Sequence, residues 1–425
     1  MSKSKKEKVK RKKVFLFSIF YFLLLTFYFT ACTPLVQKPI SEQAGTGPSV
    51  RVLLSTIQSK DSLIFSGPYM LHSEEARYEF GQKNNILYIL PLINGLQLYN
   101  QNRNLLYKEH FPITLKPAGV NSRFIYRGHT YSGSVTFQRA SDTSVHLINT
   151  LLLEKYLSGV VPSEIPSTQS DNYEAIKAQA ICARTYALNK IAENGNADYD
   201  LESTIADQVY DGLDRQTALA DQAIEETRGV VITFNGQAAT VYYHSTCGGR
   251  LESAENVWPG KTISYLAEGS DTVSDIYSCS VSPYFRWLET RSFSELDSLF
   301  QLKYQKGHLK KAVQDTTELN LNLQIMKRNS SGRVSDLRIT YGDTSVILSR
   351  YEIRHFFKDK NGKSLPSNLF YLSQPDDSTL TIHGGGFGHG VGMCQYGALY
   401  MASHGFIHYH IISKYFPGTK LVRRY

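Results

Sequence analysis

Hydrophobic and polar residues alternate in short runs over residues 49–149. The runs are four to eight residues long and are separated by clusters of Gly, Asn, Ser and Lys. Alternation with a period of two is typical of strands that bury one face. The pattern therefore predicts a β-rich N-terminal subdomain, and we expect this subdomain to serve mainly as a scaffold.

The spacing of hydrophobic positions changes to a helical period after residue 150. No Gly or Pro interrupts the stretch from Tyr173 to Ala192, and one side of it carries Ile176, Ala180, Ala183 and Ala187. Asp171 and Glu174 have the spacing of a capping box, which predicts that the helix begins near Tyr173. The alanines on the apolar side would let this helix approach a neighbour closely.

Further elements follow in a mixed order. Residues 217–227 read as a helix, and the Asn235-Gly236 pair between two apolar runs predicts a hairpin turn. Residues 286–372 combine a helical stretch with a hairpin around Ser330-Ser331-Gly332, and we interpret them as the body of a second lobe. The predicted fold class is α+β: the β-rich N-terminal subdomain is followed by a mixed α/β region in two lobes over residues 150–425.

The positive charge of the chain is concentrated at its N-terminus. Residues 1–13 contain eight Lys or Arg and one Glu, so they account for +7 of the net charge of +8. The remaining 412 residues are nearly neutral, and a polybasic surface for nucleic acid is not supported. The next eighteen residues, Val14 to Ala31, carry no charge and fit a secretory hydrophobic region or a short membrane anchor.

The end of this uncharged run resembles a lipobox, Phe29-Thr30-Ala31-Cys32. It predicts a lipoprotein-type signal peptide over residues 1–31, lipidation of Cys32, and a flexible polar tether over residues 32–48. A plain transmembrane anchor is the alternative, because Phe29 stands where a lipobox usually has Leu. Either way we expect a membrane-anchored protein of the cell envelope that faces the periplasm or the exterior.

Glu164 is the most unusual acidic residue in the chain. It stands in an apolar run with Val160, Val161 and Ile165, and prolines lie two residues to either side. Prolines stiffen the backbone, and apolar surroundings disfavour a carboxylate, so such a group can act as a general acid near neutral pH. The alternative is a structural carboxyl on a surface loop before an amphipathic helix.

The C-terminal part of the chain contains a glycine-rich stretch over residues 384–392. No GKS or GKT follows it, which argues against a phosphate-binding loop. Every second residue from 386 to 392 is Gly, so we expect an extended segment with one bare side for a sugar ring. His389 lies between two of these glycines. Another segment, His244-Ser245-Thr246 before two glycines, offers polar groups suited either to a sugar or to a hydrogen-bonded hairpin end.

Several blocks together resemble a known family. GVVPSEIP, EAIKAQAICARTYAL, HSTCGG, FGHGVGMCQYGA and YFPGTKL are similar to the motifs of the sporulation stage II protein D and LytB (SpoIID/LytB) family. This family comprises peptidoglycan lytic transglycosylases and amidase-modifier proteins. The resemblance spans residues 49–425, and residues 150–425 correspond to its catalytic region. The chain departs from the usual motifs at Ile165, Ile176, Cys182, Phe387 and Cys394.

The resemblance implies an activity and a set of site residues. It places the catalytic glutamate at Glu164 and implies glycan strands of peptidoglycan as substrate, with a cell-wall amidase as a further partner. A lytic transglycosylase needs one acid, because the C6 hydroxyl of the substrate is the attacking group, and the chemistry needs no cofactor. The expected substrate-binding residues are the polar ones in the matched blocks: Lys177, Gln179, Arg184, His244, Ser245, Thr246, His389, Gln395 and Tyr396.

The cysteines raise the question of a structural zinc. His244, Cys247 and Cys279 resemble a His-Cys-Cys set that binds zinc in some family members. A structural site needs a fourth ligand, and Tyr284 stands where relatives often have His. A disulfide between Cys247 and Cys279 is the competing interpretation.

Two other function classes remain as alternatives to the transglycosylase. The first is a non-catalytic glycan-binding protein, or an enhancer of an N-acetylmuramoyl-L-alanine amidase, in which Glu164 is structural. The second is a thiol hydrolase that uses Cys394 with His389. The reaction product distinguishes the three classes.

Overall fold

The computed structural model describes residues 47–72, 77–81, 85–108, 111–304, 321–342 and 344–425. The chain divides into two units between Ala44 and Gly45. The predicted signal peptide, the lipidation site at Cys32 and nearly all of the tether lie outside the described residues. Within the described ranges, no helix combines the length and the apolar character needed to cross a membrane.

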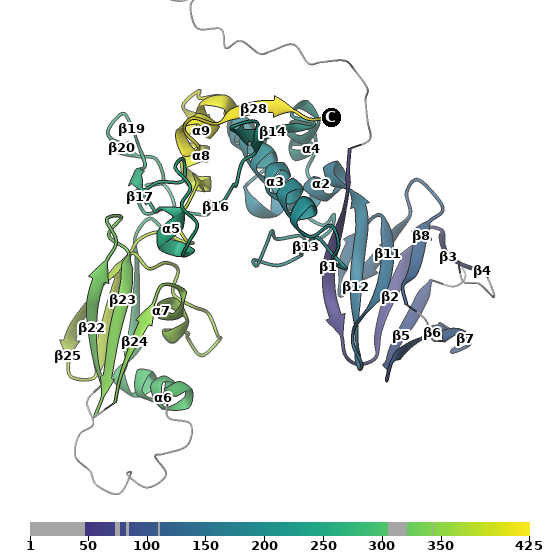
Figure 1. Ribbon diagram of the computed structural model, residues 1–425, viewed down its shortest axis with the longest axis horizontal. Coiled ribbons are helices and arrows are strands. Elements are labelled where there is room, and N and C mark those ends of the chain that lie inside the picture. The colour runs from purple at the N-terminus through teal and green to yellow at the C-terminus, as the bar shows by residue number, and fades with distance from the viewer. Residues whose placement is uncertain (1–46, 73–76, 82–84, 109–110, 305–320, 343) are drawn as a thin grey trace, which may run out of the picture. The chain divides into compact units, whose positions relative to one another are not determined.

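Two sheets, antiparallel except for one strand pair, make up the N-terminal part of the described chain (Figure 1). The seven-stranded sheet has the order β13 (Leu201–Glu202), β1 (Ser49–Ile57), β12 (Ser144–Leu152), β11 (Ser134–Ser141), β8 (Ile113–Pro117), β3 (Tyr69–His72) and β4 (Arg77–Phe80), with β13 parallel to β1. The six-stranded sheet has the order β10 (His129–Tyr131), β9 (Arg123–Tyr126), β2 (Asp61–Ser66), β5 (Ile86–Leu92), β6 (Gly95–Asn100) and β7 (Leu105–Lys108).

The two sheets share one hydrophobic core. Alternate residues point inward, as Val50 and Val52 do on β1, and both are fully buried. Aromatic rings join the sheets, since the ring of Phe65 on β2 lies 4.8 Å from that of Tyr69 on β3 and 5.1 Å from that of Phe80 on β4. Burial of these faces explains the alternating sequence pattern. The prediction of a strand-rich α+β protein is confirmed.

Helix α3 (Tyr173–Glu193) is the central element of the next region. It follows α2 (Leu153–Glu164) and a short 3-10 turn, η1 (Ser170–Asn172), and it packs against α2, α4 (Ala218–Glu226), α8 (Gln395–Ser403), α9 (His408–Tyr415) and β14 (Val230–Phe234). Its alanine face is fully buried, as the sequence predicts. The predicted capping box does not form, because Glu174 instead accepts a hydrogen bond from the backbone N–H of His408 at 2.7 Å.

The predicted turn at Asn235-Gly236 joins β14 to β15 (Gln237–Ala238). Phe234 pairs with Gln237, and both turn residues have positive φ, 50° at Asn235 and 81° at Gly236. Two positive φ values define the type I′ turn that two-residue hairpins favour. The other edge of β14 pairs with β28 (Lys420–Arg423) near the end of the chain.

Short strand pairs connect segments that are far apart in the sequence. The most important is the parallel pair of β16 (Tyr243–His244) and β27 (Met393–Cys394), which sets His244 opposite Cys394. A bridge between Thr246 and Phe387 extends this contact. The other elements here are β17 (Arg250–Leu251) with β18 (Gly269–Ser270), β19 (Thr272–Val273) with β20 (Ile276–Tyr277), and α5 (Ala254–Val257).

The segment from Trp287 to Gly384 has a hydrophobic core of its own. It contains two three-stranded sheets, β21 (Trp287–Ser292), β26 (Thr379–Gly384), β25 (Phe370–Asp376) and β22 (Leu321–Arg328), β23 (Val334–Tyr341), β24 (Thr344–Ser349), with helices α6 (Phe293–Tyr304) and α7 (Tyr351–Phe356). The predicted hairpin around Ser330-Ser331-Gly332 joins β22 to β23.

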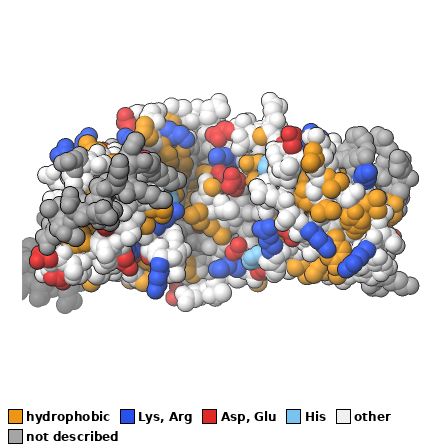
Figure 2. Space-filling model, turned by 90° about the horizontal axis from the view of Figure 1, so that it is seen from below, with side chains coloured by type: hydrophobic (Ala, Val, Ile, Leu, Met, Phe, Trp, Pro, Cys, Tyr) orange, Lys and Arg blue, Asp and Glu red, His pale blue; other side chains and the backbone are white. Residues whose placement is uncertain are grey.

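Acidic and basic side chains are mixed on the surface. Figure 2 shows Lys and Arg interspersed with Asp and Glu over the central part of one face. This distribution agrees with the near neutrality of the chain after residue 13.

Candidate functional site

Glu164 is the last residue of α2. The sequence pattern suggested a stiffened loop, but Pro162 lies inside the helix, and the backbone leaves the helix only at Ile165, with φ of −139° and ψ of 141°. The carbonyl groups of the last turn point toward the C-terminal end of a helix and disfavour a negative charge there. The position of Glu164 in the fold therefore adds to the effect of its apolar neighbours.

Two hydrogen bonds hold the Glu164 carboxyl. The backbone N–H of Val209 donates to Oε1 at 3.0 Å, and the side-chain amide Nε2 of Gln395 donates to Oε2 at 3.3 Å. Burial raises the pKa of Glu164 and outweighs these two bonds, which favour the carboxylate. The same Nε2 of Gln395 lies 3.4 Å from Oε1 of Gln179 on α3. Three distant segments thus meet at this acid.

Gln208, the residue before Val209, joins two tyrosines near Glu164 by hydrogen bonds. The hydroxyl of Tyr156 donates to Oε1 of Gln208 at 3.2 Å, and Nε2 of Gln208 donates to the hydroxyl of Tyr243 at 2.9 Å. The charge of Glu164 contributes to raised pKa values at both tyrosines, where burial is the main cause. Sequence reasoning did not find these residues. The contribution of Val209 comes from its backbone, which no side-chain pattern reveals.

Arg184 does not line the site, so its predicted role in substrate binding is corrected. The side chain is fully buried, and it forms a two-point ion pair with Glu154, at 2.8 Å from Nε to Oε1 and 2.7 Å from Nη2 to Oε2. Its guanidinium also donates to the carbonyl groups of Ile224 and Val230 and to the hydroxyl of Thr227. A side chain enclosed in this way holds α3 to α2 and cannot reach a glycan.

Lys177 and Gln179 also differ from the predicted set. Nζ of Lys177 lies 3.1 Å from Glu174 and 2.7 Å from Glu226, so its charge is engaged by two carboxylates. Gln179 is fully buried beside Gln395, and its Nε2 has no hydrogen-bond partner among the described residues. Gln179 therefore belongs to the surroundings of Glu164, whereas Lys177 stabilises the contact between α3 and α4.

His244 and His389 face one another, with ring centroids 5.4 Å apart. Nδ1 of His244 donates to the carbonyl of Val391 at 3.1 Å, and the N–H of Val391 donates to Nδ1 of His389 at 3.0 Å. Burial lowers the pKa of both rings, to about 3 for His389, so both are neutral at pH 7. Trp258 completes this aromatic group, 5.1 Å from His389.

The two hydroxyl residues after His244 have different surroundings. Thr246 is fully buried, and its Oγ1 lies 2.6 Å from Oγ of Ser282, which leaves Thr246 unable to contact a sugar. Ser245 is partly exposed and lies 3.3 Å from Thr246. The backbone N–H of Tyr396, at the start of α8, donates to the carbonyl of Ser245 at 3.1 Å. Of the predicted hydroxyl contacts, Ser245 stays accessible.

The glycine-rich segment is not the extended, bare strand that we predicted. The glycines at 386, 388, 390 and 392 all have positive φ, from 70° to 110°. A Cβ at Gly388 would lie 2.8 Å from Cβ of His244, and one at Gly392 would lie 2.2 Å from the carbonyl oxygen of Tyr242. These glycines therefore let the segment pack closely on β16 and the residues around it. The side of the segment that lacks side chains packs against the protein and is not open to a sugar.

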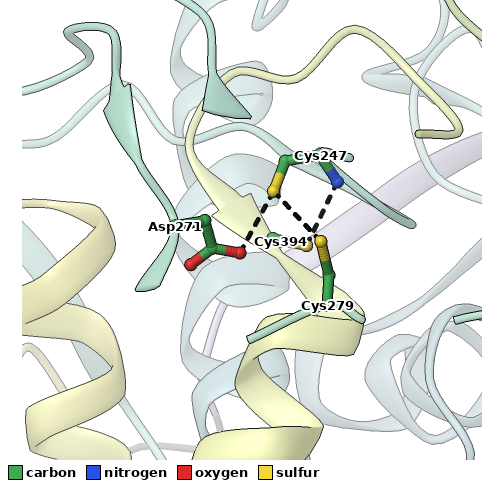
Figure 3. A group of neighbouring side chains, drawn as sticks. All are labelled: Cys247, Asp271, Cys279 and Cys394. Atoms are coloured by element: carbon green, nitrogen blue, oxygen red, sulfur yellow. Dashed lines mark hydrogen bonds between the residues drawn. The ribbon is translucent and has the colours of Figure 1, made fainter. Parts of the chain in front are cut away.

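Four buried side chains converge next to this segment, namely Cys247, Asp271, Cys279 and Cys394, and we call them the four-ligand cluster (Figure 3). Their ligand atoms all lie within 4.8 Å of one another. Sγ of Cys247 is 3.4 Å from Sγ of Cys279 and 3.1 Å from Oδ2 of Asp271. The structure corrects the predicted set, because His244 is absent from the cluster and directs its Nδ1 to Val391.

The surroundings of Cys394 contradict the thiol hydrolase alternative. Cys394 is fully buried, and burial raises the pKa of its thiol well above the usual range. Its Sγ accepts a hydrogen bond from the backbone N–H of Cys247 at 3.3 Å and lies 3.7 Å from the carbonyl of Ser245. A nucleophilic cysteine needs an accessible thiolate, and the buried thiol of Cys394 does not provide one.

Comparisons with known proteins agree with this arrangement. A family model described as stage II sporulation protein (SpoIID) matches residues 141–234, which include Glu164, and a model described as a domain of unknown function (DUF8618) matches residues 275–392. Stage II sporulation protein D of Bacillus amyloliquefaciens is 32% identical over 294 residues, which cover 66% of this chain and 76% of the relative. The chain belongs to the SpoIID/LytB family.

Two further relatives extend the comparison. An uncharacterized protein of Brachyspira hyodysenteriae is 29% identical over 376 residues, which cover 88% of this chain and 92% of the relative. The amidase enhancer of Bacillus subtilis is 29% identical over 300 residues, which cover 62% of this chain but 40% of that longer protein.

Proposed function

We propose that this chain is a peptidoglycan lytic transglycosylase that uses Glu164 as its single acid and base. The observation that carries the proposal is the state of Glu164: a partly buried carboxyl with a raised pKa, held at both oxygens by donors from distant segments. The family and the similarity to an amidase enhancer support a role in the cell wall.

The reaction has two proton transfers at one carboxyl. Protonated Glu164 gives its proton to the oxygen of the β-1,4 bond between N-acetylmuramic acid and N-acetylglucosamine, and the bond from C1 to that oxygen breaks. The C6 hydroxyl of the muramic acid then bonds to C1, and the Glu164 carboxylate takes the hydroxyl proton. The product is a 1,6-anhydro sugar, the enzyme regains its starting proton, and no water is consumed.

The environment of Glu164 suits this single-acid mechanism. Ordinary glycosidases use two carboxyls about 5 to 9.5 Å apart. Among the described residues, the pKa of Glu164 is set by its burial and by hydrogen bonds from the Val209 N–H and from Gln395. No second carboxyl among the described residues contributes to it. Oε2 accepts the longer of the two hydrogen bonds, at 3.3 Å, so we assign the transferred proton to this oxygen.

The product of the reaction tests the proposal. The full chain is incubated with purified glycan strands, and the fragments are analysed by mass spectrometry. We expect 1,6-anhydro-muramyl ends. New reducing ends would mean a hydrolase instead, and no cleavage would leave the non-catalytic alternative.

That alternative is a glycan-binding protein that enhances a cell-wall amidase, and the similarity to the amidase enhancer favours it. Its test is the rate of an N-acetylmuramoyl-L-alanine amidase on intact peptidoglycan with and without the chain. Stimulation that is equal with the wild type and with Glu164→Gln would assign the function to binding.

We also propose that the protein acts in the envelope, anchored through a lipid on Cys32. The basic residues 1–13, the uncharged run to Ala31 and the lipobox-like sequence support this location. Cys32→Ser should abolish acyl labelling and leave the precursor uncut. Normal processing of this variant would favour the transmembrane anchor.

A further inference from the structure

The four-ligand cluster draws its members from four separate segments. Cys247 follows β16, Asp271 lies between β18 and β19, Cys279 follows β20, and Cys394 ends β27. Figure 3 shows the four side chains pointing toward a common centre. Three of the four cysteines in the described residues meet here, whereas Cys182 lies apart, with Sγ 3.9 Å from Sδ of Met393.

The spacing of the ligand atoms fits one tetrahedral ion. With Zn–S bonds of about 2.3 Å, two sulfurs of a tetrahedral site lie about 3.8 Å apart. The sulfurs of Cys247 and Cys279 are 3.4 Å apart, slightly less than this value. All pairs of ligand atoms lie within 4.8 Å of one another, so the separations span the expected distance. Three thiolates with one carboxylate form a soft donor set, which suits Zn²⁺ better than Mg²⁺ or Ca²⁺.

The surrounding groups are arranged for thiolates and an oriented carboxylate. The backbone N–H groups of Cys247 and Gly249 donate to the sulfurs of Cys394 and Cys247, each at 3.3 Å. The hydroxyl of Tyr415 donates to Oδ1 of Asp271 at 2.9 Å, and Lys414 lies 3.6 Å from the same oxygen. These contacts leave Oδ2 facing Cys247. Outer groups that fix a ligand in this way are typical of metal sites.

A disulfide between Cys247 and Cys279 accounts for less of the arrangement. It would use two of the four side chains and leave a third thiol and a carboxyl buried against it. A divalent ion instead uses all four groups and offsets half of their negative charge.

We propose that Cys247, Asp271, Cys279 and Cys394 bind one zinc-class divalent ion. On binding, each of the three sulfurs forms a bond to the metal as a thiolate, and any thiol proton passes to solvent. The ion links residues 247–279 to Cys394, the residue before α8. Since Gln395 begins α8 and donates to Glu164, the ion holds a positioning residue of the candidate active site. The proposed metal site does not depend on the proposed function. Only the effect of the ion on the candidate active site, through Gln395, rests on that function.

Metal content provides the first test. The full chain, purified without chelator, should contain about one zinc per chain by elemental analysis. Cys394→Ser and Asp271→Asn should weaken binding by more than the 10- to 100-fold that is typical, in order of magnitude, of outer-shell changes. Cys182→Ser is the matched control for loss of a buried thiol, and His244→Gln tests the other ligand set. Both should retain the metal.

Cobalt(II) gives a second readout, and its first part uses the wild type alone. The wild type loaded with cobalt(II) should show thiolate-to-cobalt charge-transfer absorption and the visible bands of a tetrahedral site. In Cys394→Ser the charge-transfer intensity should fall by roughly one third, because one of three thiolates is lost. His244→Gln should leave the spectrum unchanged.

Three results would overturn the proposal. Loss of zinc in His244→Gln with retention in Cys394→Ser would assign the metal to the His-Cys-Cys set. A Cys247–Cys279 disulfide in peptides from the unreduced wild type would replace the ion, and three free thiols that take up no metal from excess zinc would leave no site.

Hydrogen exchange tests the link to α8. Removal of the metal with chelator should speed amide exchange in peptides that cover residues 393–403 and leave α4 unchanged. Equal protection of α8 with and without metal would show that the ion does not hold Gln395.

Discussion

The two ends of α2 carry the same side chain in opposite states. Glu154 in the first turn is buried, and Glu164 in the last turn is partly buried. Burial alone would raise the pKa of Glu154, but Arg184, the hydroxyl of Tyr425 and the Gly229 N–H together lower it. Burial raises the pKa of Glu164, because its partners among the described residues are two amide donors and no cation. The contrast shows that the partners of a buried carboxyl, more than burial itself, decide whether it is a structural anion or an acid.

Replacing Glu164 should have the largest effect on activity. Glu164→Gln keeps the size of a protonated carboxyl but cannot release a proton, so cleavage of glycan strands should fall by about 10²- to 10⁴-fold. Binding of strands and circular dichroism should stay close to wild type. Formation of anhydro product at the wild-type rate by a folded Glu164→Gln protein would sink the single-acid mechanism.

Removing the cation that pairs with Glu154, at the other end of α2, should lower the stability of the fold instead. Arg184→Met leaves Glu154 buried without its cation, and the free energy of unfolding should fall by about 3 to 5 kcal/mol, measured by urea denaturation. Lys177→Met is a matched control on α3, because its partners Glu174 and Glu226 are more exposed than Glu154, and this substitution should cost clearly less stability. Equal losses in the two variants would contradict the structural role of the Glu154–Arg184 pair.

The two glutamates should also respond to pH in opposite directions. The folded pKa of Glu154 is lowered, so its contribution to stability is present above its unfolded pKa of about 4.5 and is lost as the pH falls below that value. Glu154→Gln should therefore lose its stability difference from wild type in acid. The folded pKa of Glu164 is raised, so protonation favours the fold, and this favourable contribution fades as the pH rises through the raised value.

Two measurements follow for Glu164. Activity should decline as the pH rises above the folded pKa of Glu164, because the carboxyl then loses its proton. The stability of Glu164→Gln relative to wild type should grow as the pH rises from the unfolded pKa to the raised folded pKa. A wild-type activity that stays flat above the folded pKa would mean that protonated Glu164 is not required.

The smallest expected effect is at Gln395. Its amide hydrogen bond lowers the pKa of Glu164, so Gln395→Leu should move the alkaline limb of the pH-activity profile to higher pH. Tyr396→Phe is a suitable control, since Tyr396 contacts Ser245 through its backbone N–H. The same shift in both variants would indicate a general disturbance of α8.

The amino-acid sequence by itself determined the elements and their order. The period of hydrophobic residues marked the strands of the N-terminal part and the helix at 173–193, and local turn chemistry marked the hairpin at Asn235-Gly236, because these features depend on neighbours in the chain. The sequence also singled out Glu164 through its apolar run and the family motifs.

Only the tertiary structure decided which partners these groups have. Arg184 and Gln179 lie on one helix, yet Arg184 pairs with Glu154 in the core, whereas Gln179 contacts Gln395 beside the candidate active site. The sequence predicted that the glycines at 386, 388, 390 and 392 leave room for a sugar, but close packing against residues 242–247 and Arg333 requires them. Asp271 gave no signal in the sequence, and Cys394 joined Cys247 and Cys279 through the pairing of β16 with β27. The partners of a side chain depend on residues brought close by folding, and the local pattern of the chain does not contain them.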